Sequence, residues 1–118
     1  MPNILVVDDQ LGVRRLLQEM LQDEGHQVEM AGNGTEALKT LKEFKADLIL
    51  MDMKMPEMNG IDTLKEIRMS NKEVDVIMMT AYGDAQNIEQ AQNLNVTYYI
   101  SKPFDLFELR NKIREILK

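Results

Sequence analysis

The stretch that decides the fold is Ile4-Leu5-Val6-Val7-Asp8-Asp9, in which four apolar residues are followed directly by two acids. A short run that is apolar throughout is typical of a strand buried on both faces, as in a parallel sheet covered by helices. Residues 48–51 (LILM) and 76–79 (VIMM) have the same character. We therefore interpret these three runs as the central strands of one sheet.

Two further runs are less apolar and are interpreted as edge strands. Residues 28–31 alternate between apolar and polar positions, and residues 98–100 are flanked by Thr97 and Ser101. Between the five runs, apolar residues recur every three or four positions, which is typical of helices. Strict alternation of strands and helices predicts an α/β fold, a doubly wound five-stranded parallel sheet of the flavodoxin-like type. With the second and fifth strands at the edges, the predicted order is 2-1-3-4-5.

Residues 1–118 contain no linker, repeat or low-complexity stretch, and we expect one domain. The helix after the first strand is predicted to stop at Gly25, and Asp105 is predicted to cap the last helix. The fourth helix is expected to carry Ala85, Ile88 and Ala91 on one face. His26, the one histidine, follows Gly25 and is expected to be exposed and inert.

Composition excludes several classes of function. The chain has no cysteine, which excludes disulfides, thiolate metal sites and cysteine nucleophiles. A net charge of -6 argues against a nucleic-acid partner, which normally requires a basic face. The apolar run at residues 4–7 is too short to span a membrane, and nothing before it resembles a signal peptide. We expect a cytoplasmic protein with no membrane partner.

Acidic, hydroxyl and amine side chains follow the predicted strands at their carboxyl ends. In open α/β sheets the ligand site lies beyond those ends, where the strand order reverses, here between the first and third strands. The first strand ends in Asp8-Asp9, the third in Asp52 and the fourth in Thr80. The fifth is followed by Lys102. These side chains are expected to converge on one edge of the sheet.

Three carboxylates close together repel one another and require either a proton or a cation. Carboxylates with a backbone carbonyl are ligands that Mg²⁺ prefers, and the ion in turn favours phosphate. Lys102 supplies a positive charge and Thr80 a hydroxyl, so the set suits phosphoryl transfer with an aspartate as nucleophile. Asp52 is our choice of nucleophile, because it lies between the acidic pair and Thr80. The Lys54 carbonyl is placed to reach the metal.

Four ordered motifs together resemble the receiver domain of two-component and phosphorelay response regulators. They are Asp8-Asp9, residues 52–60 (DMKMPEMNG), Thr80-Ala81 and Lys102-Pro103, and they span essentially the whole chain. Residues 8–14 (DDQLGVR), 79–83 (MTAYG) and 102–105 (KPFD) are further similar to the stand-alone phosphorelay regulators of sporulating bacilli.

The resemblance implies specific roles. Asp52 would accept a phosphoryl group, while Asp8, Asp9, Asp52 and the Lys54 carbonyl would hold Mg²⁺, or Mn²⁺ in its place. Thr80 would move toward the phosphoryl group, Lys102 would pair with it, and Tyr99 would be an aromatic switch. The Lys102–Pro103 bond is expected to be cis.

The same resemblance implies the partners. They are a sensor histidine kinase as donor, a histidine phosphotransferase as acceptor in a sporulation-type relay, and an aspartyl-phosphate phosphatase. The chain would be a phosphoacceptor signalling protein rather than an enzyme, limited to self-phosphorylation and autodephosphorylation. We expect a monomer.

Four alternatives remain open at this point. A chemotaxis-type single-domain output regulator would carry the same motifs, and so would a receiver that is one part of a larger transcription factor. A Mg²⁺-dependent aspartyl phosphatase typically has two acids spaced by one residue, whereas Asp8 and Asp9 are adjacent. A flavodoxin-like FMN carrier needs a phosphate-binding loop after the first strand, where these acids would repel phosphate.

Overall fold

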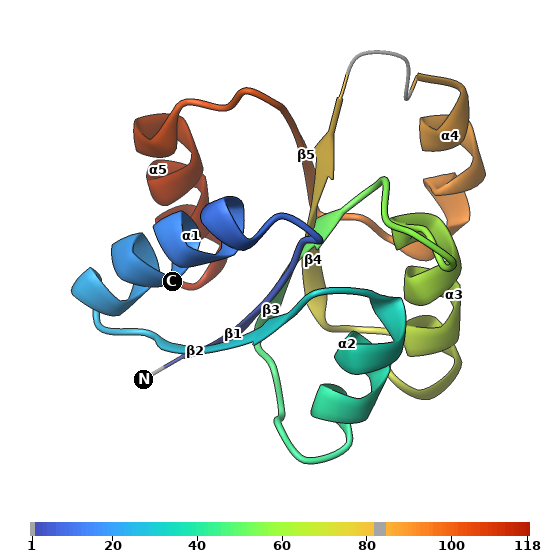
Figure 1. Ribbon diagram of the computed structural model, residues 1–118, viewed down its shortest axis with the longest axis horizontal. Helices are drawn as coiled ribbons and strands as arrows, with labels where there is room; N and C mark the ends of the chain where they lie inside the picture. The colour runs from blue at the N-terminus through green and yellow to red at the C-terminus, as the bar shows by residue number, and fades with distance from the viewer. Residues whose placement is uncertain (1, 82–84) are drawn as a thin grey trace.

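Five parallel strands form a single sheet in the computed structural model, which describes residues 2–81 and 85–118. Their order is β2-β1-β3-β4-β5 (Figure 1). The strands are β1 (Asn3–Val7), β2 (Gln27–Ala31), β3 (Leu48–Asp52), β4 (Asp75–Thr80) and β5 (Tyr98–Ser101). The predicted fold class and strand order are confirmed, and each strand extends one or two residues beyond its predicted bounds.

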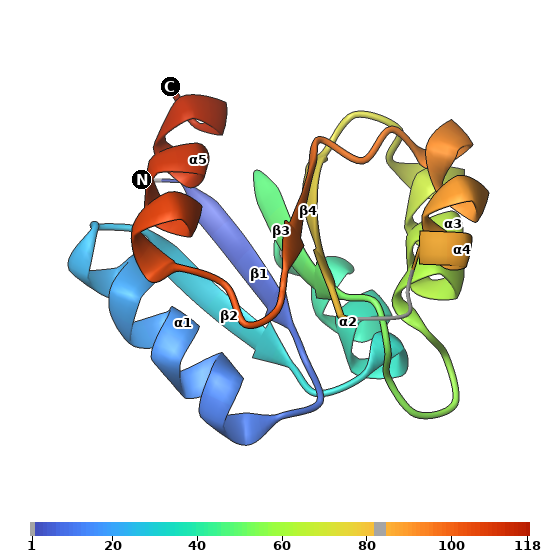
Figure 2. The same cartoon turned by 90° about the horizontal axis from the view of Figure 1, so that it is seen from above.

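Helices cover both faces of the sheet (Figures 1 and 2). One face carries α1 and α5, and the other carries α2, α3 and α4. The bounds are α1 (Leu11–Asp23), α2 (Gly34–Leu41), α3 (Gly60–Ser70), α4 (Ala85–Gln90), the short 3₁₀ helix η1 (Gln92–Leu94) and α5 (Leu106–Ile116). This is the doubly wound arrangement expected for parallel strands whose crossovers are helical.

Alternation along each central strand divides the core into two layers. Ile4 and Val6 of β1 pack with Leu17 and Leu21 of α1 and with α5. Leu5 and Val7 instead pack toward α2 and α3. Successive strand residues point to opposite faces, and here both faces are covered, so every residue of β3 is buried. The two edge strands keep exposed positions, as their sequences predicted.

The helix ends follow from local sequence with one exception. Asp105 caps α5 by accepting a hydrogen bond from the Phe107 amide (2.8 Å), as predicted. Gly25 follows α1 with φ +88°, a conformation that glycine tolerates. The fourth helix is shorter than expected: α4 ends at Gln90, and the chain continues through η1 to Asn95, which is left-handed. The expectation for His26 was wrong, because it is half-buried and its Nδ1 has no partner.

The register of the central strands brings their carboxyl ends to one edge. Val7 of β1 lies opposite Met51 of β3, so the residues that follow them, Asp8 and Asp52, are neighbours. Thr80 at the end of β4 lies opposite Ser101 at the end of β5. Because parallel strands share a direction, everything that follows them emerges at this edge.

Candidate functional site

Asp8 is fixed by contacts with three segments of the chain. Its side chain is fully buried, and its Oδ1 accepts a hydrogen bond from the Gln10 amide (2.9 Å). Its amide donates to the Ala31 carbonyl oxygen of β2 (3.1 Å). Arg14, one turn into α1, donates from Nη1 to the Asp8 carbonyl oxygen (2.6 Å). No role was predicted for Arg14 from the sequence. Its position six residues after Asp8 was the one feature of the sequence that could have indicated this contact.

Asp8, Asp9 and Asp52 form one carboxylate group. One oxygen from each can be chosen so that all three lie within 4.8 Å of one another. Asp8 and Asp52 are buried, whereas Asp9 is exposed. Three negative charges at this spacing repel, and a hard divalent cation such as Mg²⁺ or Mn²⁺ suits an all-oxygen set of this size. The residues present therefore fit a divalent metal site.

Lys102 reaches the same group from the end of β5. Its Nζ lies 2.7 Å from Asp8 Oδ2 and 3.4 Å from Asp52 Oδ2. Its amide donates to the Thr80 carbonyl oxygen (2.6 Å), and the Lys102–Pro103 peptide bond is cis, as expected. Burial alone lowers the pKa of Lys102, but the hydrogen bond that it donates to Asp8 and the charges of both aspartates raise it overall. The ammonium therefore stays charged between the two carboxylates.

Asp52 holds its proton more tightly than an exposed aspartate. Burial raises its pKa from 3.8 to about 6, and the charge of Asp8 contributes in the same direction. The Lys102 charge and hydrogen bond, and a backbone hydrogen bond from Lys54, oppose this shift. At neutral pH Asp52 is therefore ionised, and a bound cation would stabilise its negative charge.

The loop after β3 holds the Asp52 backbone closely. The Met53 amide donates to the Met79 carbonyl oxygen (3.0 Å), and the Gly60 amide donates to the Met53 carbonyl oxygen (2.9 Å). A Cβ atom at Gly60 would collide with the Asp52 carbonyl oxygen and approach Met53 Cα to 3.0 Å. Glycine at position 60 thus permits the start of α3 to pack on the Asp52 backbone.

Thr80 ends β4 and Tyr99 lies on β5, and neither side chain hydrogen-bonds to a carboxylate of the group. Thr80 is buried, and its Oγ1 donates to the Ile100 carbonyl oxygen (3.3 Å). Tyr99 is half-buried and packs against the core layer that includes Met78 and Ile67. Burial raises the pKa of Tyr99. Tyr82 and Gly83, which belong to the motif at residues 79–83, lie outside the described residues.

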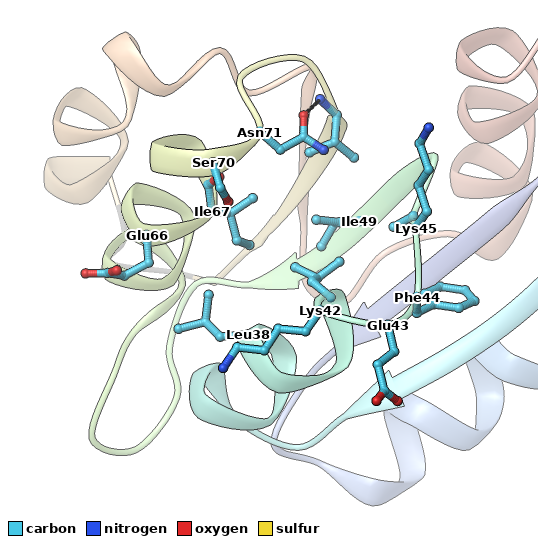
Figure 3. A pocket seen from close by; sticks show the side chains of 13 residues that line it. Leu38, Lys42, Glu43, Phe44, Lys45, Ile49, Glu66, Ile67, Ser70 and Asn71 are labelled. Carbon is cyan, nitrogen blue, oxygen red and sulfur yellow. Dashed lines mark hydrogen bonds between the residues drawn. The ribbon is translucent and has the colours of Figure 1, made fainter.

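A separate pocket of about 560 Å³ lies between α2 and α3, away from the carboxylates (Figure 3). Leu38, Ile49 and Ile67 face the same space from α2, β3 and α3. None of the carboxylates, nor Lys102, lines it. This pocket is therefore not part of the candidate site. Within residues 2–81 and 85–118, no helix has both the length and the apolar character needed to cross a bilayer.

Comparison with sequence families gives one match over nearly the whole chain, residues 4–114, to the response regulator receiver domain. The sporulation initiation phosphotransferase F of Bacillus subtilis (strain 168) is 41% identical over 97% of this chain and 92% of that protein. The regulatory protein AtoC of Escherichia coli (strain K12) is 39% identical over 98% of this chain, which spans only 25% of AtoC.

Solved structures with the same fold include two informative neighbours. The chemotaxis protein CheY4 of Vibrio cholerae superposes with a TM-score of 0.91 at 30% identity, covering 98% of both chains. The response regulator TrrA of Thermotoga maritima, solved in complex with Mg²⁺ and BeF, gives a TM-score of 0.87 at 36% identity. It covers 98% of this chain and 99% of its own.

Proposed function

The chain belongs to the response regulator receiver family, and from this membership we propose that it accepts a phosphoryl group on Asp52 in a two-component or phosphorelay system. The observation that carries the proposal is the position of Lys102 between Asp8 and Asp52, two members of the carboxylate group that also includes Asp9. This arrangement supports the proposal because it brings three carboxylates and a positive charge together at one edge of the sheet.

The proposed reaction transfers the phosphoryl group from a phosphohistidine of a sensor histidine kinase. An Asp52 carboxylate oxygen attacks phosphorus, the P–N bond breaks, and the imidazole leaves as the P–O bond of the acyl phosphate forms. Such transfers depend mainly on positioning and charge neutralisation, because the protein supplies little covalent chemistry beyond the nucleophile. Asp52 needs no deprotonation step at neutral pH, since its pKa is about 6.

The metal site is proposed to use Asp8, Asp9, Asp52 and the Lys54 carbonyl oxygen. A bound Mg²⁺ or Mn²⁺ would neutralise charge on the transferred phosphoryl oxygens. The chain's own groups do the rest: Asp8 and Asp9 attract the cation, and Lys102 offers an ammonium to the oxygens that the new phosphoryl group brings. Lys102, which is itself held by Asp8, also holds Asp52 in place through the ion pair already described.

We propose that Thr80 and Tyr99 report the phosphorylated state. The Thr80 hydroxyl is engaged by the Ile100 carbonyl oxygen at 3.3 Å, a long and replaceable hydrogen bond. A phosphoryl oxygen would be a stronger acceptor because it is charged. If Thr80 turns toward it, the space beside β5 changes, and the half-buried Tyr99 ring is placed to respond.

Onward transfer to a histidine phosphotransferase is the more specific proposal. The similarity to sporulation initiation phosphotransferase F, over nearly the full length of both proteins, favours a relay role. Leu11 and Leu16 of α1 are about half exposed, at 50% and 47%, and give that helix an apolar surface suited to a partner helix. A chemotaxis-type output regulator is the second candidate, favoured by the similarity to CheY4.

The remaining proposals follow from the family. We propose a monomeric, single-domain, cytoplasmic phosphoacceptor, with catalysis limited to its own phosphorylation and dephosphorylation. An aspartyl-phosphate phosphatase is proposed as a further partner, and neither nucleic acid nor membrane is.

The central experiment is labelling with acetyl phosphate and Mg²⁺, followed by intact mass measurement. One phosphoryl group is expected on the wild-type protein and none on Asp52→Asn, while the control Asp23→Asn, at the exposed end of α1, should label normally. Persistent labelling of Asp52→Asn would place the nucleophile elsewhere. A chase of the labelled protein with candidate histidine phosphotransferases then separates a relay, which loses the label to them, from an output regulator, which retains it.

A further inference from the structure

A buried arginine outside the carboxylate site is the feature that the proposed function does not use. Arg68, in the last turn of α3, is only 8% exposed. Each of its three side-chain nitrogens donates to a backbone carbonyl oxygen: Nε to Leu94 (2.7 Å), Nη2 to Asn95 (3.0 Å) and Nη1 to Asn71 (3.3 Å). Buried charges in proteins are normally paired with an opposite charge. Among the described residues no carboxylate lies within ion-pair distance of Arg68, although the charge of Asp75 acts on it from farther away, so the three backbone bonds are its direct partners.

The two long-range acceptors have one thing in common: they close the end of a helical segment. Leu94 is the last residue of η1, and Asn95 is its left-handed C-cap, with φ 55° and ψ 47°. Carbonyl groups at a helix end lack intrahelical partners and carry partial negative charge. A guanidinium presents several donors in a rigid fork, and it can therefore satisfy both carbonyls at once. Arg68 thus ties the end of the α4–η1 segment to α3.

The segment held by Arg68 connects the two residues proposed to report phosphorylation. It begins after Thr80 and returns to β5 just before Tyr99. Figure 2 shows α4 beside α3, with the chain running back from α4 to β5. Thr97 secures the return, because its amide donates to the Val76 carbonyl oxygen (2.8 Å) and its Oγ1 accepts from the Val76 amide (3.1 Å). The end of this segment nearest β5 is therefore held at two points, by Arg68 at Leu94 and Asn95 and by Val76 at Thr97.

Side chains of the same segment share a core layer with Tyr99. Ile88, Leu94, Val96 and Tyr99 all pack on the core layer that contains Ile67, the residue next to Arg68. A shift of Leu94 away from α3 would open that packing whatever Thr80 does. Because Arg68 holds Leu94 in place, we expect movement of this segment beside Tyr99 to start at its other end, which follows β4.

We propose that Arg68 is a positioning residue that fixes the η1 end of the α4–η1 segment, so that a change at Thr80 reaches Tyr99 as a pivot of α4 about a stationary end. This inference rests on the proposed switching role of Thr80 and Tyr99. Arg68 touches neither the phosphoryl group nor the metal ligands, and it acts only through the segment that it holds.

The first test uses amide chemical shifts of the wild-type protein, free and loaded with beryllofluoride and Mg²⁺ as a stable analogue of the phosphoryl group. The shift changes at Leu94 and Asn95 are expected to be at most half those at Ile88 and Tyr99. Changes at Leu94 and Asn95 as large as at Ile88 would overturn the proposal, because a fixed end should not move.

Two variants with a matched control sharpen this test. Arg68→Met removes every donor while retaining an unbranched chain, and the changes at Leu94 and Asn95 should at least double. Arg68→Lys retains the charge without the fork and should be intermediate. Arg15→Met, an exposed arginine on α1, should match the wild type. If the shift changes at Leu94 and Asn95 in Arg68→Met equal those of the wild type, the proposal is wrong and Arg68 has only a structural role. Lower stability alone would not alter how the shift changes are distributed along the segment.

Amide hydrogen exchange in the free protein separates failure of this proposal from failure of the proposed function. In Arg68→Met the protection of the Leu94 and Thr97 amides should fall at least tenfold more than that of Leu109 in α5. An equal loss of protection at Leu94, Thr97 and Leu109 would contradict the proposal that Arg68 fixes the η1 end of the segment. If beryllofluoride perturbs no amide around Asp52 in the wild type, the proposed function fails, and hydrogen exchange still decides whether Arg68 anchors the segment.

Discussion

The Lys102 ammonium lies nearer to Asp8 than to Asp52, at 2.7 Å against 3.4 Å. It therefore compensates both buried carboxylates when no cation is bound. Lys102→Met should lower the free energy of unfolding at pH 7 without Mg²⁺ by about 1–3 kcal/mol, because it leaves buried charge unpaired. The same variant should bind Mg²⁺ more tightly, since a competing positive charge is gone. Urea unfolding and Mg²⁺ titration measure both effects, with the exposed Lys72→Met as control. A variant that loses stability and also loses Mg²⁺ affinity would contradict this account.

The raised pKa of Asp52 predicts a pH dependence of stability with a definite sign. In the folded protein the pKa of Asp52 is about 6, against 3.8 for an exposed aspartate. Between these values the folded state binds more protons than the unfolded state, so Asp52 makes the folded protein less stable as pH rises from about 4 to 6. Asp52→Asn removes this contribution and should raise the free energy of unfolding at pH 7.5 without Mg²⁺ by on the order of 2 kcal/mol.

The measurement is urea unfolding of both proteins from pH 4 to 8 in chelator. His26 acts in the opposite direction, because burial lowers its pKa and stability then rises with pH. Both proteins contain His26, so its effect cancels in the difference. The stability gap between Asp52→Asn and the wild type should widen with pH up to about 6 and narrow when Mg²⁺ is added. A gap that does not vary with pH would contradict the raised pKa.

The main features of the fold were predictable because each central strand carries its own signal. A run such as residues 48–51 is apolar at every position only when both faces are covered, and every residue of β3 is indeed buried. Alternation in β2 marked an edge, and the edges fixed the strand order. The strand order then predicts that Asp8, Asp9, Asp52 and Lys102 lie at one edge of the sheet.

Other features were not predictable because they depend on contacts between residues distant in sequence. Arg68 bonds to carbonyl groups 26 and 27 residues away, and such groups look alike at every position of the sequence. Periodicity also could not show that α4 stops at Gln90, since Ala91 is fully buried and continues the apolar pattern past the helix end. His26 was misjudged for a similar reason, because a loop position says little about what packs over it.

Asp9 offers the cleanest test of the metal site. It is the exposed member of the carboxylate group, so its removal should cost little folding stability. Asp9→Ala removes one carboxylate ligand and is expected to weaken Mg²⁺ binding by roughly tenfold or more, as loss of a charged ligand does at sites of this kind. Isothermal titration compares it with Asp23→Ala, which should leave the affinity unchanged. Equal Mg²⁺ affinity in both variants would move the metal away from Asp9.

Replacement by alanine is expected to have different effects at Gly60 and at Gly12. An alanine Cβ at position 60 would collide with the Asp52 carbonyl oxygen, so the backbone beside the phosphoacceptor must shift. Gly60→Ala should lower stability by about 1–3 kcal/mol and slow labelling by acetyl phosphate. Gly12→Ala, where a Cβ meets nothing within 4 Å inside α1, should be neutral or stabilising by up to about 1 kcal/mol. Thermal unfolding and the labelling rate give the comparison, and similar behaviour of the two variants would show that the contact with Asp52 is unimportant.

Substitution of Thr80 should distinguish phosphorylation of Asp52 from the conformational response that follows it. Its hydroxyl bonds to the Ile100 carbonyl oxygen and not to a carboxylate, so Thr80→Ala should still label on Asp52 within a few-fold of the wild-type rate. Without the hydroxyl, nothing at position 80 can exchange the Ile100 carbonyl for a phosphoryl oxygen, and the amide shift changes at Tyr99 on beryllofluoride loading should fall to less than half. Thr80→Ser keeps the hydroxyl and should recover them. An undiminished response at Tyr99 in Thr80→Ala would mean that the signal leaves the site by another route, of which the Lys102 amide, 2.6 Å from the Thr80 carbonyl oxygen, is the nearest.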